Sequence, residues 1–514
     1  MSHELFTEAD VRQIEAEGLT VEKVLSQIDI FTEGTSPVIL NRPCKIGDGI
    51  VRIAVENMPE VIALCEQAMQ AGRVLKFVPA SGAATRMFKD WYRILEKDDI
   101  ADKKEGIRFT ENLARYAFFE DLKQVIDANK DNLEELIKAK RYTDIIEYIL
   151  TAKGMKYGSM PKAMLKFHQY PDETRTALEE HLVEGILYAR DASHICRIHL
   201  TVSEEHKDMV NKYLSEIKGK YESRYGVHIE VVLSTQQTST NTISMGMDNR
   251  PFRDDAGRLF FRPGGHGALL KNFNAIDGDI IFLKNIDNVV PDRMKSEVVH
   301  YKKVIGGYLV KIQDLIFHYL HLLESKEVDE NTIKEISSFC GSMLYITMPP
   351  KFDKLALTEK SAFFFKKLNR PIRVCGMVRN EGEPGGGPFW VEGRDDRGPL
   401  SLQIVEESQI DQGSADQKAI WKDATHFNPV DIVCGVRDYR NRKFDLQEFV
   451  DDHTFFISNK FEKGRAIKTL EYPGLWNGSM AFWNTIFVEV PTDTFHPVKM
   501  VEDLLRPQHL NNEG

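Results

Sequence analysis

The sequence contains few cysteines, and none of them stand close together in the chain. A structural zinc site or a disulfide framework needs closely spaced Cys or His residues, and the sequence has no CxxC pair and no compact Cys/His cluster. This spacing argues against both kinds of site and indicates the reduced thiols that are typical of a cytosolic protein. The six cysteines are Cys44, Cys65, Cys196, Cys340, Cys375 and Cys434.

Long hydrophobic runs and an excess of basic charge are also absent. No apolar run approaches the roughly 18 residues that cross a bilayer. The N-terminus, "MSHELFTEADVRQIEAEG", is charged, so we expect no signal peptide. The net charge of −11 argues against nucleic acid as a partner, because binding to its backbone needs clustered Lys and Arg. We therefore predict a cytoplasmic protein without a membrane or nucleic-acid partner; its oligomeric state does not follow from the sequence.

Apolar stretches of strand length alternate with helical patterns in the first half of the chain. The strand-like stretches include "RVLKFVP", "ICRIHLTVS", "VHIEVVLSTQ" and "DIIFLKN". After the first of them, Met87, Trp91 and Leu95 recur at the spacing of one helix face. This alternation predicts an α/β fold with a mostly parallel central sheet covered by helices. In such sheets, ligands bind at the carboxyl ends of the strands.

The length of 514 residues suggests roughly two to four domains, or one large core with insertions. We expect an N-terminal helical segment at residues 1–70, followed by a core at residues 71–510. Charged helical patterns predict helical insertions into this core at about residues 93–155 and 292–345. Glycine turns between strand-like runs predict a strand-rich C-terminal part.

The first candidate for ligand binding is the turn in "FVPASGAATRMFK". Small residues between a strand and a helix allow backbone N–H groups to approach a phosphate, and Arg86 then follows in what we expect to be the first helical turn. The alternative is a tight turn that packs the helix on the strand. A P-loop is excluded because GxxxxGK[ST] does not occur. The turn consists of Ser81, Gly82, Ala83, Ala84 and Thr85.

Two lysines and a glycine turn are further candidates. Lys162 follows a proline, and Lys499 lies two residues after one, so each has a restricted direction of projection. In "RPGGHGALL", Gly265 and Gly267 permit the close approach of a flat ligand, and His266 is either a contact or a capping side chain. Each of these features, taken singly, is also compatible with an ordinary surface residue or loop.

Asp287 is the candidate metal ligand. It lies at the carboxyl end of the strand in "DIIFLKNIDN", and Mg²⁺ takes few protein oxygens when phosphate and water complete its shell. Asp431, in "THFNPVDI", is the candidate for a second carboxylate ligand. The Asp277-x-Asp279 pair precedes the strand, which is the wrong end of the sheet for a ligand.

Taken in order, these segments resemble the sugar nucleotidyltransferases, above all the UTP–glucose-1-phosphate and UDP-N-acetylhexosamine pyrophosphorylases. "SGAATRM" is similar to their glycine-rich loop, "PKAM" to their Pro-Lys element and "PGGHGALL" to their base-binding turn. "IIFLKNIDN", "LQIVEESQI", "HFNPVDI" and "TFHPVKMVEDLLRP" resemble later family segments. The likeness covers roughly residues 74–506, and the whole chain also resembles a bacterial family without an assigned activity.

The resemblance implies a GT-A-like, Rossmann-related sheet and a Mg²⁺-dependent reaction of a nucleoside triphosphate, with UTP favoured, and a sugar 1-phosphate. It implies catalytic roles for Arg86, Lys162 and Lys499, and metal binding by Asp287 and Asp431. It further implies nucleotide binding by the Ser81–Thr85 loop, Gln236 and the Gly265–Gly267 turn. The sugar side is implied for Glu406, Glu407 and Asn428.

Two alternatives remain open from the sequence. A glycosyltransferase on the same fold is disfavoured by the position of the Asp277-x-Asp279 pair. A binding protein that has lost catalysis is favoured by the loop, which has Ser81, Ala83 and Ala84 where the family has mostly glycine.

Overall fold

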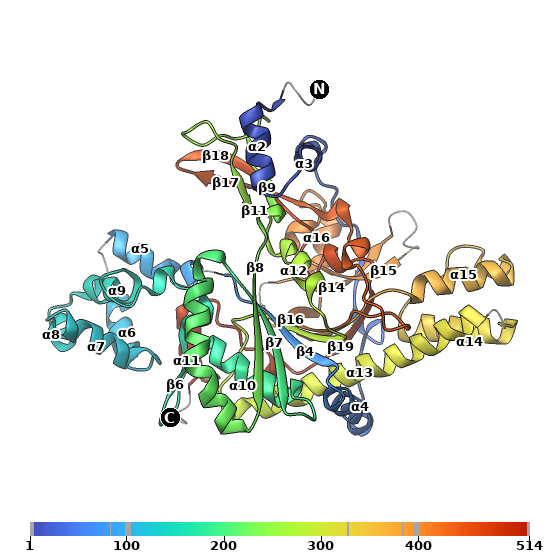
Figure 1. Cartoon of the computed structure of the whole chain (residues 1–514), viewed down its shortest axis with the longest axis horizontal. Helices are drawn as coiled ribbons and strands as arrows, with labels where there is room; N and C mark the ends of the chain where they lie inside the picture. The colour runs from blue at the N-terminus through green and yellow to red at the C-terminus, as the bar shows by residue number, and fades with distance from the viewer. Residues whose placement is uncertain are drawn as a thin grey trace. The chain divides into compact units, whose positions relative to one another are not determined.

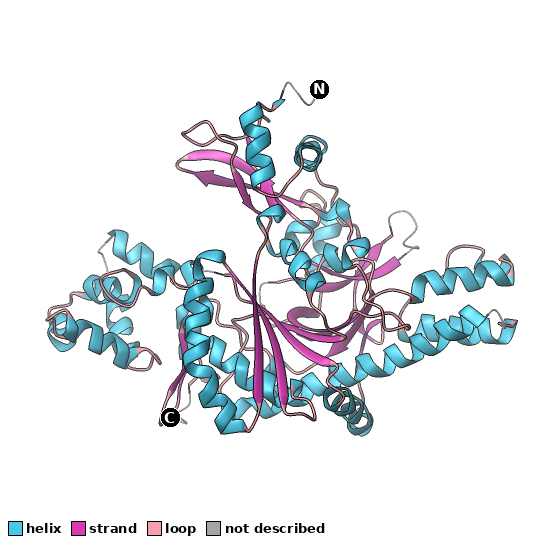
Figure 2. Cartoon of the chain, in the orientation of Figure 1, coloured by secondary structure: helices cyan, strands magenta, loops and turns pink. Residues whose placement is uncertain are grey.

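The computed structural model of the chain describes residues 5–82, 84–97, 104–325, 328–382, 385–393 and 400–510. Helices and strands alternate along much of the chain, so the predicted α/β class is confirmed (Figures 1 and 2). The chain divides into two compact units. Unit 1 contains Met1–Ala68, Gln236–Leu283 and Val304–Val490, and unit 2 contains Met69–Thr235, Lys284–Lys303 and Pro491–Gly514.

Unit 2 is built on three parallel strands in the order β4-β7-β8. They are β4 (Val74–Pro79), β7 (Ile195–Val202) and β8 (His228–Thr235). Helix α10 (Ala177–Ala189) packs on β7, and helix α11 (Lys207–Tyr225) packs on β8 (Figure 1). The parallel order follows from the helical crossovers between successive strands, as the sequence pattern predicts.

A helical stretch in unit 2 lies between β4 and the next strand. Every regular element in the described residues from 89 to 150 is a helix, as expected for most of the range 93–155 (Figure 2). Trp91 packs edge-on against Phe109 and Tyr116, which helps to hold these helices together. The helices are α5 (Lys89–Lys97), α6 (Lys104–Leu113), α7 (Phe119–Ala128), α8 (Leu133–Lys138) and α9 (Tyr142–Leu150).

Unit 1 contains strands in the order β2-β3-β19-β13-β16-β12. The pairs β2–β3, β3–β19 and β19–β13 are parallel, and β13–β16 is antiparallel. Parallel pairing therefore dominates, as predicted. The strands are β2 (Lys45–Ile46), β3 (Gly49–Val51), β19 (Asn484–Glu489), β13 (Ile372–Arg379), β16 (His426–Gly435) and β12 (Ile280–Lys284).

Smaller sheets complete the strand content. Unit 1 holds the sheets β1-β14-β15, β10-β18-β17 and β11-β9, and unit 2 holds β5-β6. The strands are β1 (Leu40–Pro43), β14 (Gly387–Glu392), β15 (Leu400–Val405), β10 (Met245–Gly246), β18 (Arg465–Glu471), β17 (Phe456–Glu462), β11 (Phe261–Pro263), β9 (Asn241–Ile243), β5 (Lys166–Gln169) and β6 (Thr174–Thr176).

The expectation of a wholly helical segment at residues 1–70 is wrong for its middle. Residues 40–51 form β1, β2 and β3, because β1 pairs with β14 and β3 pairs with β19, strands that lie hundreds of residues later in the chain. Tertiary pairing decides the conformation of strands this short, and local pattern does not report it.

The remaining helices include two long ones in the range 292–345, where helices were expected. Tyr319 of α13 donates a hydrogen bond to Glu335 of α14 at 3.0 Å. These helices are α2 (Glu8–Ala16), α3 (Val21–Glu33), α4 (Met58–Gln70), α12 (Leu270–Ala275), α13 (Asp292–Ser325), α14 (Glu330–Met343), α15 (Leu357–Leu368) and α16 (Ala415–Lys422).

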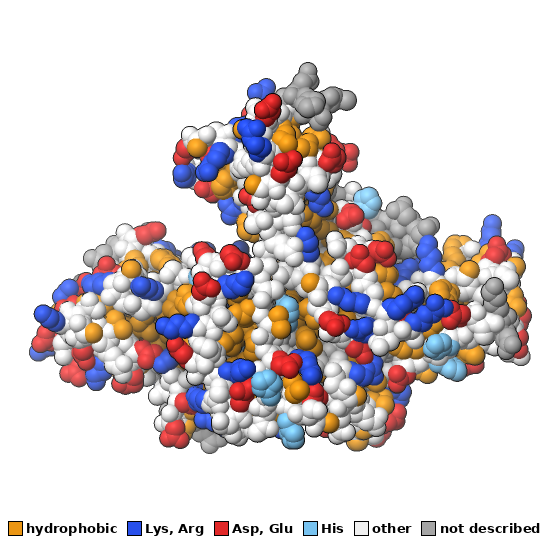
Figure 3. Space-filling model, viewed as in Figure 1, with side chains coloured by type: hydrophobic (Ala, Val, Ile, Leu, Met, Phe, Trp, Pro, Cys, Tyr) orange, Lys and Arg blue, Asp and Glu red, His pale blue; other side chains and the backbone are white. Residues whose placement is uncertain are grey.

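The distribution of surface charge and the state of the cysteines agree with what the composition indicates. Acidic and basic side chains are intermixed on the visible face, without a large area of one sign (Figure 3). All six cysteines are buried, and none of them forms a disulfide bond. Within the described part of the chain, no helix combines the length and apolar character needed to cross a membrane.

Candidate functional site

Three of the sequence-predicted residues meet in unit 2 around one carboxylate, and we call them the Asp287 cluster. Lys162 Nζ donates to Asp287 Oδ2 at 3.2 Å, and Lys499 Nζ donates to the same oxygen at 3.0 Å. Lys162 begins the short 3₁₀ turn η4 (Lys162–Met164), and Asp287 lies just beyond the carboxyl end of β12. Segments 125 and 212 residues apart along the chain thus converge on Asp287.

Burial and charge act against each other in this cluster. Burial raises the pKa of Asp287, but the ammonium groups of Lys499 and Lys162 outweigh it and hold the pKa below its usual value. Burial lowers the pKa of Lys162, although Asp287 opposes this shift. Lys162 Nζ also donates to the carbonyl of Val498 at 2.9 Å. Asp287 is therefore an ionised carboxylate that both lysines engage.

One oxygen of Asp287 remains available. Asp287 is only 8% exposed, and its Oδ1 is buried without a hydrogen-bond partner among the described residues. Buried polar atoms are usually hydrogen-bonded, so an unpartnered carboxylate oxygen marks a position for a ligand or a cation. A single carboxylate oxygen fits Mg²⁺, which takes its other ligands from phosphate and water. In the described chain, no group of three or more His, Cys, Asp or Glu side chains is arranged to hold a metal ion.

The predicted phosphate loop is tied to the segment that carries Lys162. The Lys162 N–H donates to the Gly82 carbonyl at 3.2 Å, and the Ala84 N–H donates to the Met160 carbonyl at 3.2 Å. The loop and the first catalytic candidate are thus backbone neighbours. Because Met160 occupies the Ala84 N–H, this group is not available to a phosphate.

The loop differs from the expectation in one respect. The 3₁₀ turn η2 (Ala84–Arg86) is separate from α5, which begins at Lys89, so the placement of Arg86 in the first helical turn is wrong. The turn closes with the Met87 N–H on the Ala84 carbonyl at 2.8 Å. Thr85 and Arg86 are exposed, Ser81 is half-buried and Ala83 lies outside the described residues.

The predicted base-binding turn, in unit 1, packs against the protein's own backbone. Gly265 has a φ of +73°, and a Cβ there would lie 2.6 Å from Glu471 Oε2. A Cβ on Gly267 would lie 2.1 Å from the carbonyl oxygen of Pro473. Close packing and a positive φ therefore account for these glycines, in addition to any role toward a ligand.

His266, in the same turn, has a structural position. Its Nδ1 accepts a hydrogen bond from the Leu475 N–H at 3.1 Å, and its ring stacks on Trp476 with 4.3 Å between centroids. Burial lowers the pKa of His266 to about 4, so the imidazole is neutral near pH 7. Of the two readings that the sequence leaves open, these contacts favour the capping role.

Two of the three predicted sugar-binding residues line one cavity in unit 1. The cavity has a volume of about 390 Å³, within the range of small-molecule sites, and both Glu406 and Glu407 line it. Burial and the nearby Glu471 raise the pKa of Glu406. Glu471 also packs on the Gly265 turn, so this turn and the acidic cavity share a neighbour. Other lining residues are Asn380, Phe389, Trp421, His426 and Phe427.

A bulge in β16 carries Asn428 next to this cavity. The Asn428 N–H donates to the Gly386 carbonyl at 2.7 Å, and Asn428 Oδ1 accepts from the Val430 N–H at 3.1 Å. Val430 has a φ of +58°, which a β-branched residue rarely adopts. Bulges and strained residues cluster at functional sites, so this geometry supports the selection of Asn428.

The last two predicted residues are also in unit 1. Gln236 directly follows β8, and its side-chain nitrogen is buried without a partner in the described chain. Asp431 is buried on β16 and pairs in register with Gly376 on β13. The predicted residues thus form two groups. The Ser81–Thr85 loop, Arg86, Lys162, Asp287 and Lys499 belong to unit 2, and the remaining residues belong to unit 1.

Sequence reasoning missed a buried ionic network in unit 2 that surrounds α10. Glu184 accepts from Lys76 at 3.2 Å and from Lys284 at 2.8 Å, and all three side chains are completely buried. The signal was present, because Lys76 and Lys284 interrupt apolar strands in "RVLKFVP" and "DIIFLKN". A lysine flanked by apolar residues within a strand indicates a buried ion pair.

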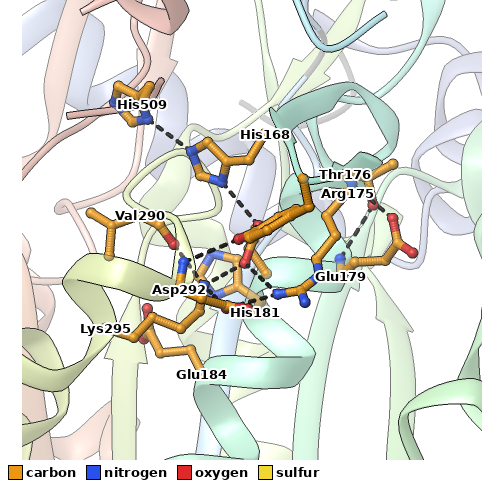
Figure 4. Close-up of polar contacts among 12 residues, drawn as sticks. His168, Arg175, Thr176, Glu179, His181, Glu184, Val290, Asp292, Lys295 and His509 are labelled. Atoms are coloured by element: carbon orange, nitrogen blue, oxygen red, sulfur yellow. Dashed lines mark hydrogen bonds and ion pairs between the residues drawn. The ribbon is translucent and has the colours of Figure 1, made fainter. Parts of the chain in front are cut away.

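A second part of this network connects to the C-terminal segment. His168 Nδ1 donates to Glu180 Oε1 at 2.9 Å, and His168 Nε2 accepts from His509 Nδ1 at 2.9 Å (Figure 4). Lys295 pairs with the other oxygen of Glu180. His181, one residue further along α10, bonds through Nε2 to the carbonyl oxygen of Ile286 at 3.1 Å, directly before Asp287 in the chain. The network therefore holds the segment that presents Asp287.

Fold and site together define an α/β protein with a charged cluster in one unit and an acidic cavity in the other. The chain belongs to the family described as "Domain of unknown function (DUF4301)", whose profile matches residues 7–510. No curated protein sequence matches it.

Several solved structures are similar to this chain at low identity. A UDP-glucose pyrophosphorylase mutant from Leishmania major is 13% identical, with a TM-score of 0.45 over 97% of this chain and 78% of that chain. The uridine diphosphate N-acetylglucosamine pyrophosphorylase from Trypanosoma brucei is 12% identical, with a TM-score of 0.48 over 97% and 79%. A UDP-glucose phosphorylase from Trypanosoma brucei is 13% identical, with a TM-score of 0.45 over 97% and 77%.

Proposed function

We propose that this protein is a nucleotidyltransferase that joins a nucleoside triphosphate, with UTP favoured, to a sugar 1-phosphate and releases pyrophosphate. The observation that supports the proposal most directly is the Asp287 cluster. Two ammonium groups and an unpartnered carboxylate oxygen meet next to a small-residue loop at the end of a strand. Phosphoryl and nucleotidyl transfer need positioning and charge neutralisation more than covalent catalysis.

In the proposed reaction, a phosphate oxygen of the sugar 1-phosphate attacks the α-phosphorus of the triphosphate in line. A new P–O bond forms, the bond from the α-phosphorus to the bridging oxygen breaks, and pyrophosphate leaves with the electron pair. Lys162 and Lys499 would stabilise the charge around the α-phosphate, and Arg86 with the Ser81–Thr85 loop would hold the β and γ groups. Lys499 is suited to reach a substrate because its side chain is 48% exposed.

Mg²⁺ is the proposed cofactor. Asp287, through its available oxygen, is the residue that would hold it, and Asp431 is the second candidate. When bound, the ion would neutralise charge on the phosphates. The protein's own contribution is to keep Asp287 ionised and fixed, which the two lysines and the hydrogen bond of His181 to the preceding residue do.

The groups in unit 1 are proposed to bind the remaining parts of the substrates. Glu406, Glu407 and Asn428 would bind sugar hydroxyl groups at the cavity of about 390 Å³. Gln236 and the Gly265–Gly267 turn would bind the base, with His266 holding the turn in place. The partially buried, polar lining of the cavity suits a sugar, since carboxylates accept hydrogen bonds from hydroxyl groups.

A screen for pyrophosphate release tests the proposal. Four nucleoside triphosphates would be combined with several sugar 1-phosphates in the presence and the absence of Mg²⁺. We expect release only when both substrates and the ion are present, and the fastest release with UTP. Release of a nucleoside diphosphate from a nucleotide sugar, without pyrophosphate chemistry, would instead indicate the glycosyltransferase alternative.

A binding protein without catalysis is the second candidate. It is favoured by the Ala84 N–H, which Met160 occupies, and by the two lysines, which Asp287 already engages. This candidate predicts that UTP raises the melting temperature although no substrate pair releases pyrophosphate. A protein that responds to neither measurement would contradict both candidates.

A further inference from the structure

A small polar cavity in unit 1 is lined by none of the residues assigned above. It is found where β13 and β19 begin, beside the first residues of β15, and its volume is about 60 Å³. Its described lining includes Lys367, Arg370, Ser401, Trp483 and Thr485, and no described lining residue is Asp or Glu. A single water needs roughly 10–15 Å³ by this kind of measure, so the cavity has room for several waters or one small oxyanion.

Arg370 faces this cavity without an acidic partner. Its guanidinium donates only to backbone carbonyls, to Lys366 O at 3.1 Å and to Phe482 O at 3.3 Å. No carboxylate in the described chain lies within ion-pair distance of it. Burial lowers the pKa of Arg370, and no charged neighbour opposes that shift. A partly buried cation bonded only to neutral groups is a position that favours an anion.

A second lining residue, Trp483, carries a buried donor, and the buried Arg373 contacts the lining through Thr485. Arg373, which is completely buried, donates through Nε to Thr485 Oγ1 at 2.8 Å, and Thr485 lines the cavity. One terminal nitrogen of Arg373 has no partner among the described residues, and neither has the buried indole N–H of Trp483. Such donors are costly to bury unless an acceptor meets them. The described lining of this oxyanion-sized space therefore includes the donors of Arg370 and Trp483 and no Asp or Glu.

We propose that this cavity binds a tetrahedral oxyanion, either inorganic phosphate or the phosphate group of a small monoester. Arginine suits such a ligand because its planar guanidinium can donate two hydrogen bonds to one phosphate. None of its described lining residues belongs to the Asp287 cluster. Strand β15 begins at this cavity with Leu400 and ends at Val405, next to Glu406 of the acidic cavity. An anion here is thus placed to influence the acidic cavity through one strand.

Binding would be measured by tryptophan fluorescence and by thermal shift, with inorganic phosphate titrated against potassium chloride at equal ionic strength. We expect a saturable, phosphate-specific response from the wild-type protein. Arg370→Gln should weaken binding by about tenfold or more, as expected for the loss of a charge-assisted hydrogen bond. Ser401→Glu should abolish the response, because the new carboxylate would occupy the place of the anion. This variant also tests the site if Arg370→Gln folds poorly. Lys366→Gln, which removes an exposed lysine near the end of α15, should bind as the wild type does.

Phosphate could also bind at the Asp287 cluster, and Lys499→Ala separates the two sites. The proposal requires that the response survive Lys499→Ala and disappear with Ser401→Glu. A response that follows the opposite pattern, or one that chloride reproduces, would overturn it. Titration with glycerol 1-phosphate then identifies the source: binding equal to or tighter than that of phosphate indicates a phosphate monoester, and weaker binding indicates the free ion.

Discussion

Unit 2 contains two carboxylates that each lie between two lysines, yet they differ in what they leave open. Glu184 pairs with Lys76 and Lys284, and all three side chains are 0% exposed. Asp287 pairs with Lys162 and Lys499, whose side chains are 12% and 48% exposed. The two sites have the same charges, so composition alone does not distinguish them.

The difference lies in the unused hydrogen-bonding capacity. Both oxygens of Glu184 are occupied, Oε1 by Lys76 and Tyr188 and Oε2 by Lys284. Asp287 uses only Oδ2, and its Oδ1 has no described partner. A closed ionic group contributes to structure, whereas a group with an unpartnered buried oxygen is prepared for a ligand. This contrast can be tested on both sides.

The largest effect is expected at the closed site. Glu184→Gln leaves Lys76 and Lys284 buried without a carboxylate, which should destabilise unit 2 by about 3–5 kcal/mol. Burial already lowers the pKa of Lys76 to about 7, so this lysine can lose its proton in the variant. We therefore expect a much lower melting temperature, with the deficit smaller at about pH 9 than at about pH 6.

Asp287→Asn is the matched change at the open site. The lysines of the Asp287 cluster are partly exposed, so water can solvate them when the carboxylate is removed. We therefore expect a much smaller loss of stability than for Glu184→Gln. Thermal melting of both variants under the same conditions measures the difference. Equal losses for both variants would show that the Asp287 cluster is a structural ion pair like the other.

The second prediction concerns activity. Lys499→Ala should reduce pyrophosphate release by roughly a hundredfold or more, the scale of losing one preorganised charge donor. Stability should change little, because the side chain is half exposed. Lys212→Ala, an exposed lysine on α11 of the same unit, is the control and should retain full activity. Wild-type turnover in the Lys499 variant would remove this residue from the mechanism.

The third prediction extends the contrast to an acidic residue of unit 1. Glu406 lines the cavity of about 390 Å³, so Glu406→Gln should raise the KM for sugar 1-phosphate by about tenfold, the scale of one hydrogen bond to a charged group. The KM for the nucleotide should stay the same. Glu448→Gln, an exposed glutamate in unit 1, is the control. A change in both KM values, or in neither, would argue against a sugar-binding role.

The sequence predicted the alternating strands of both units because hydrophobic periodicity reports burial along one element. It also predicted that Asp287 lies beyond the carboxyl end of an apolar strand, and β12 confirms this place; the metal-binding role of Asp287 stays a prediction. It could not predict that Lys162 and Lys499 share one oxygen, since such a contact depends on segments far apart in the chain. Strands β1 to β3 were missed for the same reason.

For the glycine turn, the structure gives a different reason for the glycines than the one inferred from the sequence. Gly265 and Gly267 indicated close approach of a ligand, but their near neighbours are Glu471 and Pro473 of the protein itself. Glycine reports only that something lies close, and it does not report what. The charged residues of α10 were overlooked because helix periodicity does not separate a solvated charge from one that is paired inside the protein.

The smallest effect is expected from the histidine pair beside Glu180. Burial lowers the pKa of His168, and it lowers the pKa of His509 well below the usual 6.5. Above pH 6.5 both imidazoles are neutral in the folded and the unfolded state, so protonation does not reduce the free energy of unfolding. Below pH 6.5 these two histidines take up protons in the unfolded chain but not in the folded one, so the free energy of unfolding falls. The loss from His509 should appear as a melting temperature that falls as the pH drops from about 6.5 to about 5.

His509→Asn tests this titration without removing the donor to His168, because the side-chain amide can replace the Nδ1–H. We expect its melting temperature to fall less steeply with pH than that of the wild type. His300→Asn, which changes an exposed histidine of α13, is the control variant. Carboxylates with lowered pKa values, such as Glu180, titrate below this window and do not contribute to the slope. If the slope of His509→Asn equals that of the wild type, the acid sensitivity belongs to other buried histidines, and the pair beside Glu180 is then only a packing contact.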